Sequence, residues 1–187
     1  MTRLSSLEEL ERLYAARGDL NYGEGVTQIE HALQCAALAQ EHAAAPSLVI
    51  AALLHDVGHL FEDEADVAQS RIDDRHETSG ADALAGLFGE AVCGPIALHV
   101  AAKRYLCFRE PGYFHALSAA SQRSLALQGG PFEAAGAAAF ERSAHWREAV
   151  ALRRYDDWGK REESSVRVFA DYGPTMRSLL LDAAPDR

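Results

Sequence analysis

The feature of this sequence that most restricts its fold is a set of histidines and aspartates spread along apolar, helix-like segments. Its six members are His31, His55, Asp56, His76, His99 and Asp156. His55 and Asp56 follow the apolar run LVIAALL, where burying an unpaired carboxylate costs several kcal/mol unless a cation compensates it. Four imidazoles and two carboxylates have the donor chemistry of a two-metal site suited to iron or manganese. The sequence therefore predicts helices that converge on a metal centre.

Apolar spacing along the chain predicts an all-α bundle of roughly seven to nine helices. Helices are expected at residues 7–17, 28–42, 46–57, 76–89, 95–105 and 145–160, with short helical pieces between 107 and 130. Residues 62–74 are acidic and irregular, which favours a surface loop or lid, and the Ala- and Gly-rich segment 131–142 indicates a mobile connection. No alternation typical of a sheet is present. We expect one domain over 1–187, with a helical tail at 161–187.

Composition excludes two broad classes of function. A formal net charge of −10 argues against a general binder of nucleic acid or anionic membranes, because phosphate groups are bound through clustered Lys and Arg. Three cysteines, Cys35, Cys93 and Cys107, sit in apolar segments without a C-x-x-C pair, so we expect them to be buried and reduced. The N-terminus lacks the apolar stretch of a secretion signal, and no segment is apolar enough to span a membrane. These features favour the cytoplasm.

Polar residues at helical spacing surround the proposed ligands. His59 lies four residues after His55, and Lys103 four after His99, so each shares a face with a ligand if its helix continues. Arg153 and Lys160 flank Asp156 at spacings of three and four residues. Cations beside a two-metal centre would form a pocket for a phosphate or phosphonate dianion, to which Ser121 and Ser124 could add hydroxyl donors. A solvated charged face is the alternative for Arg153 and Lys160, and is expected for Arg154.

The pattern H…HD…D, carried here by His31, His55-Asp56 and Asp156, resembles the HD superfamily of metal-dependent phosphohydrolases. The strings QIEHALQCA, AALLHDVGH, HVAAKRYL, LQGGP and RRYDDWGK resemble a narrower group, the HD-domain mixed-valent di-iron oxygenases that cleave the carbon–phosphorus bond of 1-hydroxyphosphonates. This resemblance covers about residues 7–160.

The resemblance implies two irons, as Fe(II)/Fe(III), with dioxygen as co-substrate and a small phosphonate as substrate. All six ligands would hold the irons, and Asp56 would bridge them. The phosphonate would be held by His59, Lys103, Ser121, Ser124 and Arg153, with Lys160 in a supporting position. Phosphate would be the released product.

Family members that act on 2-amino-1-hydroxyethylphosphonate use a Tyr and a Glu before the first ligand helix to meet the substrate ammonium. Tyr22 and Glu24 occupy that loop here, one residue closer together than in the family pattern, and glycines flank the Glu. The closer spacing leaves room for a larger cation, and a trimethylammonium group relies on charge and aromatic contact. This slightly favours the trimethylamino substrate, which would yield glycine betaine, over the free amine, which would yield glycine.

Two other classes of function remain open at this point. An HD phosphohydrolase of a nucleotide or phosphate monoester would use a metal-bound hydroxide and need no oxygen. A binding protein without catalysis would need none of the six ligands. Taken singly, His76 or His99 would more often be a core or solvated histidine, and only the joint pattern favours ligation. The sequence leaves open whether the protein is a monomer or a homodimer.

Overall fold

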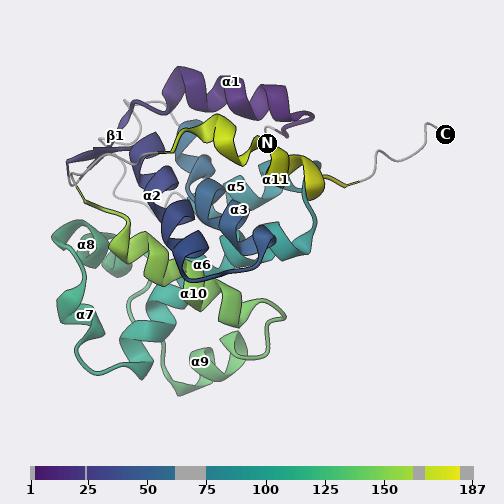
Figure 1. Cartoon of the computed structure of the whole chain (residues 1–187). Helices are drawn as coiled ribbons and strands as arrows, with labels where there is room; N and C mark the ends of the chain where they lie inside the picture. Colours follow the sequence, from purple (N-terminus) through teal and green to yellow (C-terminus); the bar gives the residue numbers. More distant parts are fainter. Residues whose placement is uncertain (1–2, 24, 62–74, 162–166, 182–187) are drawn as a thin grey trace.

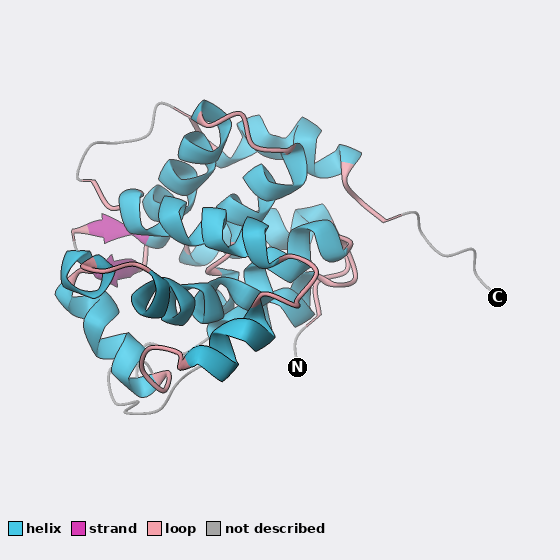
Figure 2. Cartoon of the chain, turned by 90° about the horizontal axis from the view of Figure 1, so that it is seen from below, coloured by secondary structure: helices cyan, strands magenta, loops and turns pink. Residues whose placement is uncertain are grey.

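The computed structural model describes residues 3–23, 25–61, 75–161 and 167–181. Within these ranges it contains ten α-helices, two 3-10 helices and one two-stranded hairpin, so the expected all-α fold is confirmed (Figures 1 and 2). The helices outnumber the expected seven to nine because several are short, such as α7 with four residues and α11 with six.

The elements follow one another along the chain with bounds close to those expected. The α-helices are α1 (Leu7–Arg17), α2 (Gln28–Glu41), α3 (Pro46–Leu54), α5 (His76–Leu84), α6 (Glu90–Arg109), α7 (Tyr113–Ala116), α8 (Ala119–Leu127), α9 (Ala134–Phe140), α10 (Trp146–Trp158) and α11 (Gly173–Ser178). The 3-10 helices are η1 (Val57–Phe61) and η2 (Phe169–Tyr172), and the strands are β1 (Asn21–Gly23) and β2 (Val26–Thr27).

Helix α2 begins at a capping box. The Thr27 hydroxyl accepts from the backbone N–H of Glu30, while the Glu30 carboxylate accepts from the backbone N–H of Thr27. Such reciprocal bonds satisfy two N–H groups at the helix start and contribute about 1 kcal/mol. The cap therefore fixes the first turn of α2, where His31 lies.

Helix α3 occupies the centre of the bundle, between α2 and α6 (Figure 1). Its side chains Ile50, Leu53 and Leu54 have no exposed surface, and burial of each such side chain contributes about 1.5–3 kcal/mol. Helix α10 packs on α6 and α2. Helix α3 anchors the chain before His55-Asp56, and η1, which follows the pair, packs on α5, so the pair is presented from a rigid part of the core.

Three expectations about secondary structure were wrong. Strands β1 and β2 pair as a small antiparallel hairpin, because the backbone bonds that they exchange do not need alternating apolar residues. The supposed mobile connection contains α9, whose Phe140 packs on Tyr105 and Trp146. After Leu54 the chain does not continue as an α-helix but turns through η1.

The remaining expectations have mixed outcomes. In the tail, η2 and α11 cover residues 169–178, and Phe169, Tyr172 and Met176 join the core. Cys35 and Cys93 are buried and all three cysteines are free thiols, but Cys107 is only half-buried. The proposed lid, 62–74, lies outside the described residues. No helix in the described part of the chain combines the length and apolarity needed to cross a bilayer.

Candidate metal centre and anion pocket

Two pairs of imidazoles meet at the centre of the bundle. His31 of α2 and His55, at the end of α3, bring their Nε2 atoms within 3.3 Å of each other. His76 at the start of α5 and His99 of α6 bring theirs within 3.1 Å. All four residues are buried. Four elements far apart in sequence therefore direct nitrogen atoms to two neighbouring points.

Asp56 lies between the two pairs of imidazoles. Its Oδ2 atom is 3.3 Å from His55 Nε2 and 3.7 Å from His31 Nε2. Its Oδ1 atom is 3.6 Å from both His76 Nε2 and His99 Nε2. One carboxylate that offers a different oxygen to each nitrogen pair has the geometry of a bridge between two metal ions.

Asp156 of α10 adds a second carboxylate to the first pair, since its Oδ1 atom lies 3.5 Å from His31 Nε2. Cys35 also lies within reach of His31 and His55. However, burial raises the pKa of the Cys35 thiol, and its Sγ donates to the Tyr155 carbonyl. The carboxylate is therefore the better ligand, and the donor set consists of nitrogen and oxygen, which suits iron or manganese.

Backbone carbonyls orient three of the imidazoles. His55 Nδ1 bonds Ala52 O at 3.0 Å, His99 Nδ1 bonds Ile96 O at 2.8 Å, and His31 Nδ1 bonds the more distant Gly159 O at 2.8 Å. A carbonyl oxygen only accepts, so each Nδ1 carries the proton and each Nε2 lone pair faces the centre. The imidazoles are thus fixed in the tautomer that a metal requires.

Two glycines permit the close contacts that bring these segments together. A Cβ on Gly58 would lie 2.1 Å from the carbonyl oxygen of His76, so only glycine lets η1 lie against the start of α5. A Cβ on Gly159 would lie 2.6 Å from Cys35 Sγ, so only glycine lets the end of α10 approach α2. Neither role was inferred from the sequence, although both glycines stand within three residues of a ligand.

The charge states of several buried groups suit metal binding, although Cys35 and Asp156 outweigh burial at His31 and raise the pKa of its imidazole. Burial lowers the pKa of His55 and His99, which keeps them neutral. Burial opposes ionisation of Asp56, yet electrostatic attraction from the nearby histidines outweighs it and holds the pKa of that carboxyl well below its usual range, so a cationic partner favours the ionised form. Neutral imidazoles around ionised carboxylates are the forms that bind a metal cation.

A pocket of cations lies beside Asp156. Lys103 Nζ of α6 donates to Ser124 Oγ at 2.8 Å. Arg153 Nη2 of α10 and Lys160 Nζ both lie 3.4 Å from Ser121 Oγ of α8. The structure thus brings three cations and two serine hydroxyls together where α6, α8 and α10 join. We call this set of five residues the anion pocket.

Two cations of the anion pocket are almost completely buried. Lys103 and Arg153 are each only 3% exposed. Burial, and then the neighbouring charges of Arg153 and Lys160, lower the pKa of Lys103 to about 8. Asp156 and Asp157 pair with Arg153 and Lys160, whereas Lys103 donates to a neutral serine, and a buried cation in such a position favours an anion beside it. The arrangement therefore favours binding of a dianion such as a phosphonate.

Two residues that the sequence analysis did not select hold Arg153 in place. Asp157 accepts from Arg153 and from the Tyr113 hydroxyl, and Arg153 Nε donates to that hydroxyl at 3.3 Å. Arg153 also pairs with Asp156. The doubled carboxylates of the RRYDDWGK string were a visible signal for this clamp, whereas Tyr113 lies 40 residues away from Arg153 in sequence and gave none.

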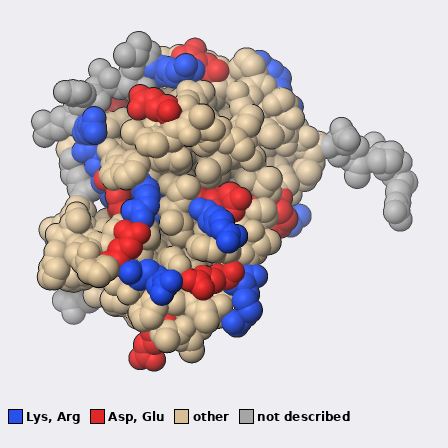
Figure 3. Space-filling model, turned by 60° about the horizontal axis from the view of Figure 1, so that its bottom comes forward, with Lys and Arg blue, Asp and Glu red and all other residues tan. Residues whose placement is uncertain are grey.

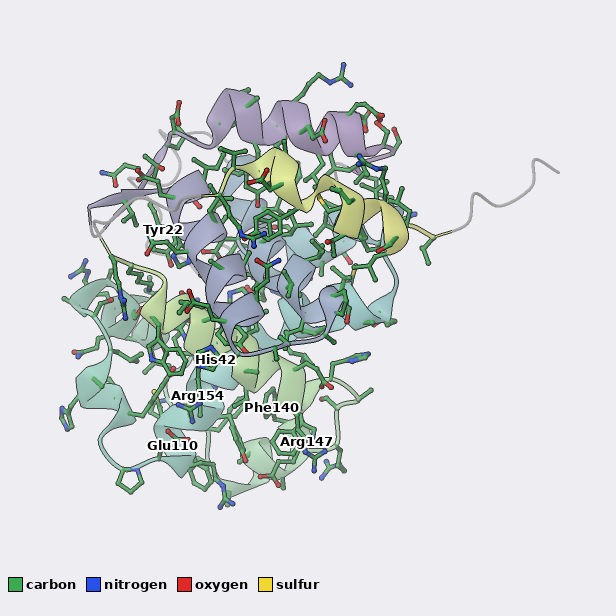
Figure 4. All side chains as sticks on the ribbon, viewed as in Figure 1. Tyr22, His42, Glu110, Phe140, Arg147 and Arg154 are labelled. Carbon is green, nitrogen blue, oxygen red and sulfur yellow. The ribbon has the colours of Figure 1, made fainter. Side chains whose placement is uncertain are left out.

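The other predicted contacts lie elsewhere around the centre. The His59 ring stacks on that of His76 with centroids 4.0 Å apart, so His59 lies at the second nitrogen pair. The Tyr22 ring stacks on His31, also at 4.0 Å, and its hydroxyl lies 3.4 Å from Asp156 Oδ1. Tyr22 belongs to β1, and Figure 4 shows it on the side of the bundle where that strand runs. Glu24 lies outside the described residues.

The surface differs from this interior. Arg154 pairs with Glu110 at partly exposed positions, as expected for a solvated charge (Figure 4). On the face shown in Figure 3, basic side chains are interleaved with acidic ones and form no continuous basic stripe. That face does not have the charge distribution of a nucleic-acid interface.

Comparison with known proteins agrees with this geometry. The HD domain family matches residues 29–121. The chain is 46% identical to a hydroxymethylphosphonate dioxygenase of Gimesia maris, over 95% of this chain and 88% of that protein. It is 36% identical to the glycine-betaine-forming [1-hydroxy-2-(trimethylamino)ethyl]phosphonate dioxygenase of Leisingera caerulea, over 96% of this chain and 93% of that protein.

Proposed function

This chain belongs to the family of HD-domain hydroxyphosphonate dioxygenases, and from that premise we propose that it cleaves the carbon–phosphorus bond of a 1-hydroxyphosphonate with dioxygen. One observation carries the proposal. Asp156 contacts both His31 of the metal centre and the cations Arg153 and Lys160 of the anion pocket. The overall balance is R–CH(OH)–phosphonate plus O2 giving R–COOH plus inorganic phosphate.

Two iron ions fit the donor set. His31, His55 and Asp156 would hold one and His76 and His99 the other, with one oxygen of Asp56 on each. When bound, the irons would supply Lewis acidity to the substrate oxygens and the redox chemistry that activates dioxygen. The nitrogen and carboxylate donors and the inward-facing Nε2 atoms support this assignment.

The anion pocket supplies binding and orientation. Lys103 and Arg153 would neutralise the phosphonate dianion, and the guanidinium can bind two of its oxygens at once. Ser121 and Ser124 would donate to the remaining oxygens. Because these groups come from rigid helices, the phosphonate is held in one pose relative to the metal centre, which positions C1 for oxidation.

Asp156 couples the two halves of the site. Its Oδ1 faces His31, while Arg153 and Lys160 pair with it from the pocket side. Although burial opposes ionisation, these two cations hold the pKa of Asp156 well below its usual range. A shared carboxylate of this kind would fix the distance between the bound phosphonate and the metals.

The relatives differ in the group on C1, which is hydrogen in hydroxymethylphosphonate and a trimethylaminomethyl group in the other substrate. Their names therefore support 1-hydroxyphosphonates as the class of substrate. They do not decide the substituent on C1, and both amino-substituted compounds belong to this class. The protein's three free thiols fit a reducing compartment such as the cytoplasm. Nothing in the proposed chemistry requires more than one chain.

The proposal is tested by measuring phosphate release from the iron-loaded protein in air and under nitrogen. The substrates are hydroxymethylphosphonate, 2-amino-1-hydroxyethylphosphonate and its N-trimethyl analogue. We expect release from at least one substrate, in air only. Release that continues at the same rate under nitrogen would instead indicate a hydrolase.

A further inference from the structure

Two hydrogen bonds join the side chain of Gln34 on α2 to the backbone that follows α10. The Gln34 Nε2 atom donates to the carbonyl oxygen of Arg161 at 2.8 Å, and the Gln34 Oε1 atom accepts from the N–H of Arg161 at 3.0 Å. One amide group therefore satisfies both backbone groups of a residue that lies 127 positions away in the sequence. A pair of opposed bonds fixes both the position and the direction of the backbone at Arg161.

The same face of α2 carries the metal-ligand candidate His31. Gln34 follows His31 by three residues, a spacing that places both side chains on one face of the helix. His31 Nδ1 bonds the carbonyl oxygen of Gly159 at 2.8 Å. Two side chains of α2 therefore hold residues 159–161 at both ends, His31 at Gly159 and Gln34 at Arg161.

Lys160 lies between these two points of attachment. Its Nζ atom is 3.4 Å from Asp156 Oδ1 and 3.4 Å from Ser121 Oγ. The backbone that carries the Lys160 side chain is the one that Gln34 holds against α2. A shift of residues 159–161 would therefore move two groups at once, the carbonyl that orients the His31 imidazole and the ammonium of the anion pocket.

We infer that Gln34 is a positioning residue that aligns the metal centre with the anion pocket by holding residues 159–161 against α2. It acts through the Gly159 carbonyl and the Lys160 ammonium. The inference rests on the proposed function, and it adds a residue that the sequence analysis did not select.

A role limited to stability predicts a different result from a positioning role. Arg161 is exposed, so water can replace both bonds when the amide is removed, and the fold is expected to survive. Only His31 depends on the Gly159 carbonyl, and disturbing a partner that orients a ligand typically weakens metal binding 10–100-fold. Positioning therefore predicts a loss confined to the metal on the His31 side, whereas a role in stability alone predicts no such asymmetry.

The test is a calorimetric titration of the metal-free proteins with iron(II) under nitrogen, with thermal unfolding as the check on the fold. The variants are Gln34→Met, which removes both bonds at similar side-chain length, and Gln34→Glu, which removes the donor to the Arg161 carbonyl. His31→Ala identifies the binding event on its own side. Gln40→Met is the matched control, because Gln40 lies on the same helix and its amide oxygen has no hydrogen-bond partner among the described residues.

We expect both Gln34 variants to bind the iron on the His31 side about 10–100-fold more weakly than wild type. The other iron should stay within about twofold of wild type, as expected for an independent site. The control should bind both irons as wild type does. Equal weakening of both irons, or unchanged binding of both, would overturn the inference.

A second measurement tests the connection to Lys160. The affinity of the iron-loaded proteins for hydroxymethylphosphonate is titrated under nitrogen in Gln34→Met, Lys160→Gln and the double variant. Since Gln34 acts through Lys160 in the anion pocket, the two losses should be less than additive. Fully additive losses would overturn this part of the inference.

The outcomes also separate the inference from the proposed function. Neither titration requires turnover, so the iron(II) measurements decide the role of Gln34 even if no phosphonate releases phosphate. Absence of phosphate release from every compound would overturn the proposed function alone.

Discussion

The two ends of the site, the metal centre and the anion pocket, are oriented by different parts of the molecule. At the metal centre, His55 and His99 are each aligned by a carbonyl three residues earlier in the chain. In the anion pocket, Lys103 and Arg153 are aligned by side chains of other elements, such as Ser124 and Tyr113. The first arrangement follows from local helix geometry, whereas the second depends on tertiary packing. Changes in the pocket should therefore alter substrate binding while the metals stay bound.

The largest effect is expected at the bridge. Asp56→Asn removes the carboxylate whose two oxygens face the two imidazole pairs, and loss of one member of a buried charge group costs about 3–5 kcal/mol. We expect metal affinity to fall by about a thousandfold and phosphate release to be lost, as measured by metal content and turnover. Asp157→Asn is the matched control and should keep both metals. Two metals retained in Asp56→Asn would show that Asp56 is not the bridge.

A smaller effect is expected from Arg153→Lys, which keeps the charge but loses the planar guanidinium. Loss of a buried, charged hydrogen bond costs about 2–5 kcal/mol, so KM for the phosphonate should rise by about 30-fold or more while metal content stays the same. Arg154→Lys, the neighbouring change at a partly exposed position, should leave KM unaltered. Loss of metal from Arg153→Lys would break the distinction between the two ends of the site.

Gly159→Ala tests a long-range contact that orients a ligand at the metal centre, the bond from His31 Nδ1 to the Gly159 carbonyl. The added methyl would contact Cys35 Sγ and push α10 away from α2. Disturbing a partner that orients a ligand typically costs 10–100-fold in metal affinity. Combining it with Cys35→Ala makes room for the methyl and should restore part of the affinity. Equal losses with and without Cys35→Ala would contradict this explanation.

Lys103 provides a pH test of the anion pocket. Its pKa is lowered to about 8, and only the protonated form attracts a dianion, so kcat/KM should fall as pH rises through about 8. The folded state then binds fewer protons than the unfolded state between about pH 8 and 10, so this lysine's contribution to the free energy of unfolding should increase over that range. Activity and stability should thus change in opposite directions.

The matched variants for this pH test are Lys103→Met and Lys103→Arg. Lys103→Met should have a flat profile at low activity and be more stable at pH 7, by about 1–3 kcal/mol, because a buried charge is removed. Lys103→Arg should keep its charge through pH 9. A fall in kcat/KM near pH 8 that persists in Lys103→Arg would assign the titration to another group.

The smallest effect is expected at the surface. Arg154→Gln removes the pair with Glu110, and exposed ion pairs contribute less than about 1 kcal/mol. The midpoint of thermal unfolding should shift by no more than a few degrees. kcat/KM should stay within twofold of wild type, which corresponds to a change of about 0.4 kcal/mol in the activation free energy. A large loss of activity would mean that the pocket extends to Arg154.

The same contrast explains what the sequence could predict. His31, His55 and His99 stand on helices whose apolar spacing is clear, and a buried polar residue on such a helix is conspicuous. By contrast, the closeness of Gly58 to His76 and of Gly159 to Cys35 depends on how helices pack, which spacing along one helix does not encode. The contacts of Tyr22 with His31 and Lys160 depend on the hairpin, which the sequence did not predict. Local features were therefore predictable from the residues, whereas contacts between distant elements were predictable only where the resemblance to a known family supplied them.

The two-metal site and the anion pocket are tested together by anomalous diffraction from crystals of the iron-loaded protein, grown without oxygen in the presence of hydroxymethylphosphonate. We expect two iron peaks, one on each side of Asp56, and the phosphonate against Lys103, Arg153 and the serines of α8. A single iron, or a phosphonate bound away from this pocket, would contradict it.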